Sequence, residues 1–471
     1  MTTSNLDQIS KRLWDTINVF RGVLDMEVVK DYILALFLFK FLSDLADEMH
    51  EFAPFIIPED VRFKQIYMDA HHDSIGERLD DALRIIESSN SDSLPIDISF
   101  TSYKLGDKLE RDKRLFIFLK LLSEFDFSKD MILAKDIFEY IIQRFATEGG
   151  KKGGLYYTPV EVSNLLAQLT EPKIGESIYD PACGTGGLLI ECAEYIKKDY
   201  KESASYALFG QELSGAAWTI ARQNMLVHEE YNADVRLGDT ILEPRHVTND
   251  GSLRKFDVVV CHPPFLLKDW GYEFASHDPY HRFDRGIPPK SQGDYAFICH
   301  MIESLELNSG RLAVVVPHGA LFRASSDKKI RQKLIEEGLL DAVIGLPPKL
   351  FFGTSIPAVV LIFKRRKKEN NVVFIDASKE YEDGRLQNRL TPDGLDKILQ
   401  CYKERNEVEK FSRIVSLEEI FENEFNLNIP RYIDTSEDQE EFDLELLQEE
   451  RDKLQRQLLQ LEEKMMAYLK M

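Results

Sequence analysis

Hydrophobic residues in the first third of the chain recur every three or four positions. The clearest series is Leu24, Val28, Tyr32, Ala35, Phe39 and Leu42. This spacing predicts a helix, and neither glycine nor proline interrupts residues 23–52. The same spacing returns over residues 113–125 and 132–145. We therefore expect residues 1–148 to form a helical domain.

A glycine-rich segment at residues 149–154 ends this pattern and is a candidate domain boundary. Beyond it short apolar runs alternate with helical stretches, and we predict strands at residues 177–179, 207–211, 234–237, 257–261, 311–317, 340–346 and 358–363. Alternating strands and helices are typical of a doubly wound, mostly parallel sheet. The sequence therefore predicts an α/β fold, in which ligands bind at the carboxyl ends of the strands.

The end of the chain carries a single apolar stripe at helical spacing. Its members are Leu447, Leu454, Leu458, Leu461, Met465 and Leu469. Residues 434–471 also carry 12 acidic and 5 basic side chains. A helix of this kind packs on a partner or folds back on its own body. We expect residues 433–471 to form a C-terminal acidic amphipathic helix for subunit assembly.

The formal net charge of −22 limits how the chain can contact nucleic acid. A protein that clamps DNA by itself usually presents a basic surface, because phosphate contacts dominate the affinity. Contact with DNA is therefore expected to be local, or to be supplied by a partner. The one dense basic run, at residues 364–368, is expected to be a solvated loop that follows a strand.

Cysteine usage and hydropathy indicate the compartment. The five cysteines form no CxxC pair, which favours a reducing cytoplasm and argues against a structural zinc site, so we expect no metal. The most apolar stretch, Tyr32 to Leu42, contains Lys40 and is too short to span a bilayer. The first residues lack the basic and apolar segments of a signal peptide. We expect a cytoplasmic protein without a membrane partner.

Acidic residues stand at the ends of three successive predicted strands. Asp180 begins a Gly-rich turn at 180–187, where the backbone can approach a ligand closely and the following helix offers free N–H groups. Taken singly, this turn is also compatible with an ordinary tight connection between a strand and a helix. Glu212 alone is also compatible with a surface residue at the start of a helix. Together, Asp180 can accept from a cofactor amino group, Glu212 from ribose hydroxyls, and Asp239 from an adenine amino group. Because Gly-x-Gly-x-x-Gly is absent, S-adenosylmethionine fits better than NAD.

The predicted strand at 257–261 ends abruptly in His262, Pro263, Pro264 and Phe265. Two successive prolines remove two backbone donors and fix two φ angles, so the strand must stop in a stiff loop that presents carbonyl groups. Stiff carbonyls beside an aromatic ring suit the capture of a planar group that bears an amino function. Methyltransferases that act on exocyclic amino groups carry Asn, Asp or Ser where this chain has His262.

Taken together, these motifs resemble those of the modification (M) subunit of type I restriction–modification systems, an adenine-specific DNA methyltransferase. The resemblance runs through residues 22–25, 30–34, 155–159, 180–187, 211–212, 223–225, 238–240, 262–265 and 426–432. It implies that residues 155–432 form the catalytic domain, with S-adenosylmethionine as cofactor. The cofactor-binding residues that it implies are Leu155, Tyr156, Tyr157, Thr158, Pro159, Asp180, Cys183, Gly184, Thr185, Gly186, Gly187, Glu212 and Asp239.

The family chemistry gives the loop at 262–265 its expected role. The target adenine must leave the duplex, since the cofactor cannot reach a stacked base. Phe265 would stack on the flipped base, and an acceptor at His262 and the Pro263 carbonyl would accept the two amino hydrogens. Such acceptors fit the transition state better than the ground state. The predicted catalytic residues are therefore His262, Pro263, Pro264 and Phe265.

His262 is the departure from the family pattern. A neutral imidazole has one acceptor nitrogen, whereas a protonated one has none and would repel the positive sulfonium of the cofactor. We hypothesise that activity is strongly reduced unless His262 is neutral, with its acceptor nitrogen facing the pocket. The alternative function is a catalytically impaired, methyltransferase-like scaffold that binds cofactor and assembles with a specificity subunit.

The resemblance also implies partners. These are double-stranded DNA, a separate specificity (S) subunit that reads the sequence, and a second copy of the M subunit. A restriction (R) subunit is left open as a further partner, and the C-terminal helix is expected to pack against helices of the S subunit. A protein or RNA amino-group methyltransferase is the rival class, because some of those enzymes use a Pro-Pro-aromatic loop. The N-terminal helical pattern and the match at 426–432 argue against it.

Overall fold

The computed structural model divides the chain into two compact units, Met1–Ile433 and Asp434–Met471, and each is described by itself. The structure describes residues 3–20, 25–49, 53–69, 74–90, 94–148, 157–200, 205–352, 354–367, 369–385, 387–435 and 444–469. The predicted boundary at 149–154 lies outside these residues, as do Leu155 and Tyr156.

The first unit begins with a set of helices around one apolar core, as the hydrophobic spacing predicts. They are α1 (Thr3–Ile17), α2 (Met26–Met49), α3 (Phe63–Met68), α4 (Ile75–Ser89), α5 (Lys108–Leu122) and α6 (Met131–Glu148), with the 3-10 turns η1 (Asn18–Phe20), η3 (Glu59–Val61) and η4 (Tyr103–Leu105). The central helix is α2, in which 15 residues are buried. Its buried Lys40 forms an ion pair with Asp44 and donates to the carbonyl of Phe125 at 2.7 Å, so the charge is not left unpaired.

A nine-stranded sheet follows, in the order β11-β8-β6-β7-β5-β4-β1-β2-β3. Its strands are β1 (Ser177–Asp180), β2 (Ala207–Glu212), β3 (Asp234–Leu237), β4 (Val258–Cys261), β5 (Arg311–Pro317), β6 (Leu340–Gly345), β7 (Ala358–Lys364), β8 (Val372–Asp376) and β11 (Ser412–Val415), and β9 (Tyr381–Glu382) pairs with β10 (Arg389–Leu390) in a separate ribbon. The seven predicted strands agree with β1 to β7 to within one residue at each end. Neither β8 nor β11 was predicted, and both lie after residue 366, where no strand was expected.

Most neighbouring strands of the sheet are parallel, and β7 is the main exception. Five pairings are parallel, whereas β7 is antiparallel to both β5 and β6, and β11 is antiparallel to β8. A parallel return usually needs a crossover helix. The β6–β7 connection contains Pro347, Pro348 and Pro357 and no helix among its described residues, so the chain returns antiparallel.

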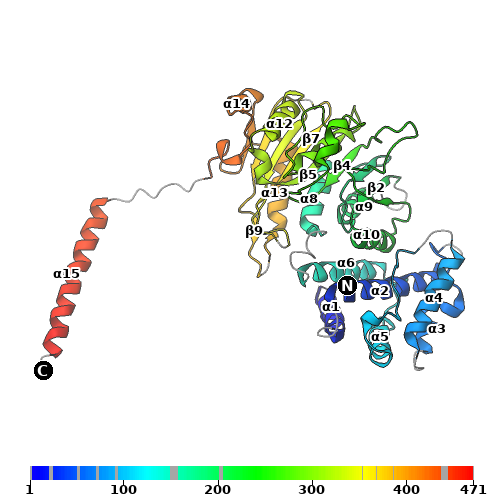
Figure 1. Ribbon diagram of the computed structural model, residues 1–471. Coiled ribbons are helices and arrows are strands. Elements are labelled where there is room, and N and C mark those ends of the chain that lie inside the picture. Colours follow the sequence, from blue (N-terminus) through cyan, green and yellow to red (C-terminus); the bar gives the residue numbers. More distant parts are fainter. Residues whose placement is uncertain are drawn as a thin grey trace. The chain divides into compact units, whose positions relative to one another are not determined.

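Helices cover both faces of the sheet, which confirms the predicted doubly wound α/β class. They are α8 (Val160–Thr170), α9 (Gly187–Tyr200), α10 (Gly215–Val227), α11 (Asp294–Glu303), α12 (Ser326–Glu336), α13 (Pro392–Glu404) and α14 (Leu417–Glu422), with the 3-10 turns η7 (Tyr272–His277), η8 (His318–Leu321) and η9 (Ile429–Arg431). Successive side chains of a strand point to opposite faces. Val314 of β5 therefore lies in the core under α11 and α12, while Val315 lies in the core under α8, α9 and α13 (Figure 1).

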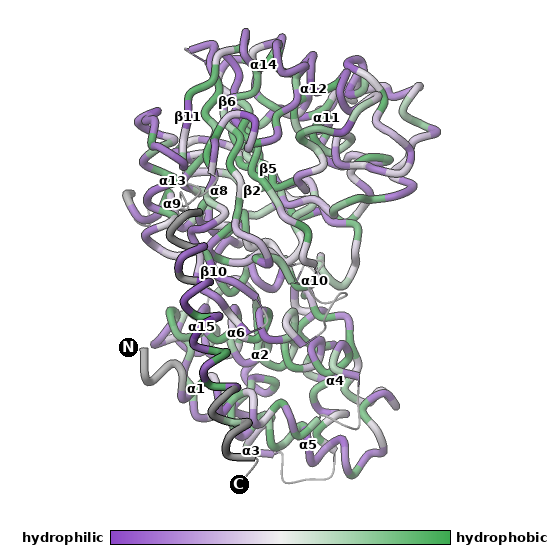
Figure 2. Tube along the Cα trace, turned by 90° about the vertical axis from the view of Figure 1, so that its left-hand side faces the viewer, coloured by the Kyte–Doolittle hydropathy of each residue, from purple (hydrophilic) through white to green (hydrophobic). Residues whose placement is uncertain are grey.

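Helix α10 joins the α/β part to the N-terminal helices. Its Ile220 and Val227 belong to the same apolar core as α2 and α6. Gln223 of this helix is buried and donates through its side-chain amide to the carbonyl of Pro95 at 2.6 Å. Figure 2 shows hydrophobic residues concentrated in the central strands and in α2, with hydrophilic residues along the outer loops.

The second unit contains one long helix, α15 (Leu444–Leu469), as the apolar stripe predicts. Four stripe residues whose side chains are described, Leu454, Leu458, Leu461 and Met465, are each at least 57% exposed. Among the described helices of the whole chain, none combines the length and apolar character that crossing a bilayer requires.

Candidate active site

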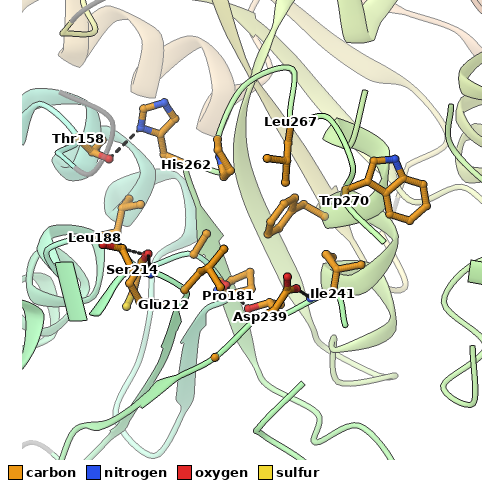
Figure 3. Close-up of a pocket in the computed structure, with 18 of the residues that line it drawn as sticks. Thr158, Pro181, Leu188, Glu212, Ser214, Asp239, Ile241, His262, Leu267 and Trp270 are labelled. Carbon is orange, nitrogen blue, oxygen red and sulfur yellow. Dashed lines mark hydrogen bonds between the residues drawn. The ribbon is translucent and has the colours of Figure 1, made fainter. Parts of the chain in front are cut away.

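A cavity of about 490 Å³ opens where the carboxyl ends of β1, β2, β3 and β4 meet (Figure 3). The predicted site residues that line it are Thr158, Cys183, Gly184, Thr185, Gly187, Glu212, Asp239, His262 and Pro264. The other described residues that were predicted lie outside its lining, namely Tyr157, Pro159, Asp180, Gly186, Pro263 and Phe265. Residues of the expected cofactor motifs and of the Pro-Pro loop therefore share one cavity.

The Gly-rich turn after β1 forms one wall of the cavity. Gly186 has a φ of +85°, and an added Cβ would lie 2.8 Å from the terminal methyl group of Met225. A side chain at this position would therefore strain the backbone, and it would also displace the flexible end of Met225. The N–H of Gly186 donates to the carbonyl of Cys183 at 2.8 Å, which closes the turn just before α9 begins. Glycine is required here for the shape of the turn.

Glu212 stands at the end of β2 and is only 6% exposed. One carboxylate oxygen accepts from the N–H of Gly184 at 2.9 Å, and the other accepts from the N–H of Ser214 at 2.8 Å. Burial raises the pKa of Glu212, while these backbone hydrogen bonds oppose the shift. Each carboxylate oxygen has two lone pairs, so Glu212 can still accept from ligand hydroxyl groups.

Asp239 follows β3 and points into the cavity, as Figure 3 shows. Its Oδ1 accepts from the N–H groups of Ile241 and Leu242, both at 2.9 Å. Within the described part of the chain, Oδ2 of Asp239 has no hydrogen-bond partner. This oxygen is therefore free to accept from a planar amino group, with Ile241 as an apolar neighbour in the wall.

Arg282 supports the loop after β3 and was not among the predicted site residues. Arg282 is 3% exposed. Its guanidinium pairs with Asp278 at 2.7 Å and donates to the carbonyls of Thr240 at 3.2 Å and Ile241 at 2.8 Å. The two hydrogen bonds to the carbonyls therefore connect the segment after the Pro-Pro loop to the loop that carries Asp239, and the ion pair with Asp278 holds the guanidinium in place. Arg282 lies in an irregular stretch, so no spacing signal marks it.

Asp180, at the end of β1, lies behind the cavity wall. It is fully buried, and its Oδ1 accepts from the N–H of Ala182 at 3.0 Å. Burial raises the pKa of Asp180 to about 7, against the hydrogen bonds from Ala182 and from the thiol of Cys261. Its placement gives it a role in the shape of the turn. Its predicted contact with a cofactor amino group stays a prediction.

His262 lies at the rim between the cofactor motifs and the Pro-Pro loop. Its Nδ1 is 2.9 Å from the hydroxyl oxygen of Thr158, and its ring packs against Phe265 at 5.1 Å and Phe351 at 4.6 Å between centroids. Burial lowers the pKa of His262 to about 4, so the ring is neutral at pH 7. One of the two conditions of the His262 hypothesis, a neutral ring, is therefore present.

Phe351 is the aromatic residue that the sequence analysis missed. It is 6% exposed and lies 5.9 Å from Phe265 between ring centroids. A signal was available, because β6 is followed by Pro347 and Pro348 and then by Phe351, another strand that ends in two prolines and an aromatic residue. The described residues contain no group of three or more His, Cys, Asp or Glu side chains arranged to hold a metal.

Two family models match the chain. The model for N-6 DNA methylase matches residues 128–441, and the model for the HsdM N-terminal domain matches residues 9–125. The first of these alone covers more than half of the chain.

Individual relatives agree with the family models. The type I restriction enzyme MjaVIII methylase subunit of Methanocaldococcus jannaschii is 31% identical over 87% of this chain and 72% of its own length. The type I restriction enzyme MpnII methylase subunit of Mycoplasma pneumoniae is 28% identical over 94% of this chain and 92% of its own length. Among solved structures, the methyltransferase subunit of the type I restriction–modification system from Streptococcus thermophilus superposes with a TM-score of 0.83, at 33% identity over 92% of this chain and all of that one. The chain therefore belongs to the N-6 DNA methylase family, as a type I restriction–modification methylase subunit and an adenine-specific DNA methyltransferase.

Proposed function

We propose that this subunit transfers a methyl group from S-adenosylmethionine to the exocyclic amino group of an adenine that has flipped out of duplex DNA. One observation carries the proposal. The acceptors for an adenosine, Glu212 and Asp239, and the two residues of the target loop, His262 and Pro264, line the same cavity. A cofactor and a planar amino group can therefore meet inside it.

The cavity fits the adenosine part of the cofactor. Its volume of about 490 Å³ is in the usual range for small-ligand sites. Glu212 offers acceptors for two ribose hydroxyls, and the free oxygen of Asp239 offers one for the adenine amino group. When bound, S-adenosylmethionine supplies a methyl group to the adenine nitrogen, as the carbon–sulfur bond breaks with its electrons left on sulfur.

The protein's own groups then act on the target base. The carbonyl of Pro263 and one nitrogen of His262 accept the two amino hydrogens and draw the nitrogen toward tetrahedral geometry. This stabilises the positive charge that develops there before a proton leaves to solvent. Phe265 provides a face on which the unstacked base can lie. A neutral His262 is compatible with this function, because one of its ring nitrogens can accept a hydrogen bond and a charged ring would offer no acceptor.

A methyl-transfer assay tests the proposal directly. The full chain is purified with its S subunit and incubated with methyl-labelled cofactor. In separate reactions, the methyl acceptor is protein, RNA, or duplex DNA that contains the recognised site. Label in N6-methyladenine of the duplex is expected. Label in protein or RNA would contradict the adenine assignment, and cofactor binding by calorimetry without transfer to any acceptor would favour the scaffold instead.

We further propose that the three parts of the chain divide the work. In this proposal, residues 1–148 form a helical domain and residues 155–432 carry catalysis. Residues 433–471 join the S subunit in a complex that also holds a second M subunit and admits an R subunit. The apolar stripe of α15 supports the last assignment, because a long helix with one apolar face has area to bury against another chain.

Deletion of residues 436–471 is expected to abolish co-purification with the S subunit while cofactor affinity stays unchanged. The combined substitution Leu454→Glu and Leu461→Glu should have the same effect, because each charge would be buried without a partner in the interface. Gln460→Ala, on the opposite side of α15, is the matched control and should assemble normally. Pull-down with tagged S subunit measures the outcome, and assembly of the deleted chain would rule out this role.

A further inference from the structure

The chain turns sharply straight after Phe265. Leu266 has a φ of +54°, in the left-handed region that residues other than glycine rarely adopt. Two hydrogen bonds hold the turn. The N–H of Leu266 donates to Oδ1 of Asp294 at 3.1 Å, and the N–H of Gly293 donates to the carbonyl of Leu267 at 2.9 Å. Because a strained backbone persists only where its surroundings fix it, the place of Phe265 depends on the start of α11.

We propose that Asp294 is a positioning residue that fixes this turn and so holds Phe265 where the target base can stack on it. The inference rests on the proposed function, from which it takes the role of Phe265. Asp294 is 1% exposed and lies outside the cavity lining, so it can act only through other residues. Leu267 beyond the turn and Phe297 further along α11 do line the cavity (Figure 3). The hydrogen bond from Leu266 therefore joins two parts of the cavity wall.

The second oxygen of Asp294 fixes the orientation of the carboxylate. Arg323, which follows the turn η8, pairs through Nη2 with Oδ2 of Asp294, and its Nε pairs with Asp327 of α12 at 2.8 Å. A guanidinium and a backbone N–H can only donate, so the direction of both hydrogen bonds to Asp294 is fixed. Asp294 thus connects the Pro-Pro loop to the loop after β5.

Arg323 is itself held by Arg331 of α12. Arg331 is 3% exposed and donates to the carbonyl of Arg323 at 3.2 Å. Its Nε donates to the carbonyl of Phe425 at 2.7 Å. Phe425 directly precedes the segment 426–432, one of the motifs that resemble the family, so this segment adjoins the same network. Arg323 therefore has a fixed place from which to orient Asp294.

Asp294→Asn is the informative substitution, because an amide has one oxygen where the carboxylate has two. The charged guanidinium of Arg323 is expected to take that oxygen, which leaves the amide NH2 facing the N–H of Leu266. The turn should then lose its hydrogen bond and open. In the double variant Asp294→Asn with Arg323→Met, the oxygen is free to return to Leu266 and should close the turn again. A role in stability alone predicts the opposite, namely that the second substitution adds to the damage of the first.

Hydrogen exchange of the full chain, followed by mass spectrometry, measures the turn without an activity assay. The two prolines carry no N–H, so a peptide over residues 263–267 reports few amides besides that of Leu266. Leu266 is expected to exchange about tenfold faster in Asp294→Asn than in the wild type, and at close to the wild-type rate in the double variant. Unchanged exchange in Asp294→Asn would overturn the inference, and so would faster exchange in the double variant than in the single one. The single variant decides the question if the double variant fails to fold.

Asp341→Asn is the matched control. Asp341 is also a buried carboxylate in two ion pairs, with Lys364 and Arg405, but it lies at the amino end of β6 and outside the cavity lining. Its substitution should lower the melting temperature as Asp294→Asn does, with no change in exchange at Leu266 or in methyl transfer. Faster exchange at Leu266 in Asp341→Asn would show that any loss of stability opens the turn, which would refute the role of Asp294.

Kinetics supply a second readout that a merely structural role would not produce. Asp294→Asn should lower the single-turnover rate of methyl transfer by about 10–100-fold, because a small displacement of the stacking face misplaces the base. In the Phe265→Ala background, where no ring has to be held, the same substitution should cost less than about threefold. An equal loss in both backgrounds, or an open turn with an unchanged rate, would contradict the inference. If the wild type transfers no methyl group at all, the proposed function fails, while hydrogen exchange still decides whether Asp294 fixes the turn.

Discussion

Replacing His262 by alanine is expected to lower the rate of methyl transfer by a factor of about 10²–10³, the usual effect of removing one preorganised stabilising group. The substitution removes the acceptor for one amino hydrogen and leaves the Pro263 carbonyl alone to polarise the nitrogen. Single-turnover rates at saturating cofactor, with the assembled complex and its DNA site, measure the effect. An alanine variant that methylates as fast as the wild type would remove His262 from the mechanism.

His262→Asn is the matched control, because it returns an acceptor of the type found in related enzymes, and we expect it to retain transfer. The pH dependence of the ratio of wild-type to Asn rates is more informative than either rate. Burial lowers the pKa of His262 to about 4, and only the protonated ring lacks an acceptor. The ratio should therefore stay constant from pH 8 to about 5.5 and decrease only as the pH approaches the lowered pKa. A decrease between pH 7.5 and 6 would show that the ring titrates as an ordinary histidine.

Replacing Glu212 by alanine is expected to weaken cofactor binding by about 10–100-fold, from the loss of hydrogen bonds to a charged acceptor. The carboxylate accepts from the N–H groups of Gly184 and Ser214 and has further lone pairs directed at the cavity. Its removal leaves those donors without their acceptor and takes away the partner of the ribose hydroxyls. Calorimetric titration with S-adenosylmethionine measures the change.

Two variants control the Glu212 experiment. Glu212→Gln keeps one side-chain oxygen in the same place, so its affinity should fall between those of the wild type and the alanine variant. Glu243→Ala removes a carboxylate on the loop after β3 whose side chain is 63% exposed and outside the cavity lining, so it should bind normally. Unchanged affinity in Glu212→Ala would show that this acid is not part of the cofactor site.

The strand pattern of this chain was predictable, whereas the direction of β7 was not. Apolar runs gave β1 to β7 to within a residue, because each is a short hydrophobic segment bounded by polar or turn residues. A period of two is the same in parallel and antiparallel strands, so the pattern could not show that β7 returns between β5 and β6. β11 contains only two adjacent apolar residues, Ile414 and Val415, and gives little signal. β8 has an apolar run, at residues 372–375, as long as that of β4, so its signal was present and was missed.

Some residues of the candidate site were likewise predictable from the sequence, whereas the contacts between distant segments were not. Glu212, Asp239 and His262 were predicted because each follows a predicted strand, and parallel strands bring their carboxyl ends together. The contact between Thr158 and His262 joins residues 104 positions apart, and the Arg282 contacts to the loop after β3 span about 40 positions. Contacts between residues so far apart in the sequence depend on how the helices and strands pack together. Hydrophobic spacing does not encode that packing.

The core that α10 shares with the N-terminal helices restricts which parts of the protein can be exchanged. Ile220 and Val227 face α2 and α6, while Ser214, at the start of the same helix, is held by Glu212 in the cofactor cavity. An N-terminal domain transplanted from a relative would meet the outer face of an α10 that it did not evolve with. In functional chimeras within the family, the outer residues of α10 and the N-terminal domain that covers them should therefore have to come from the same protein.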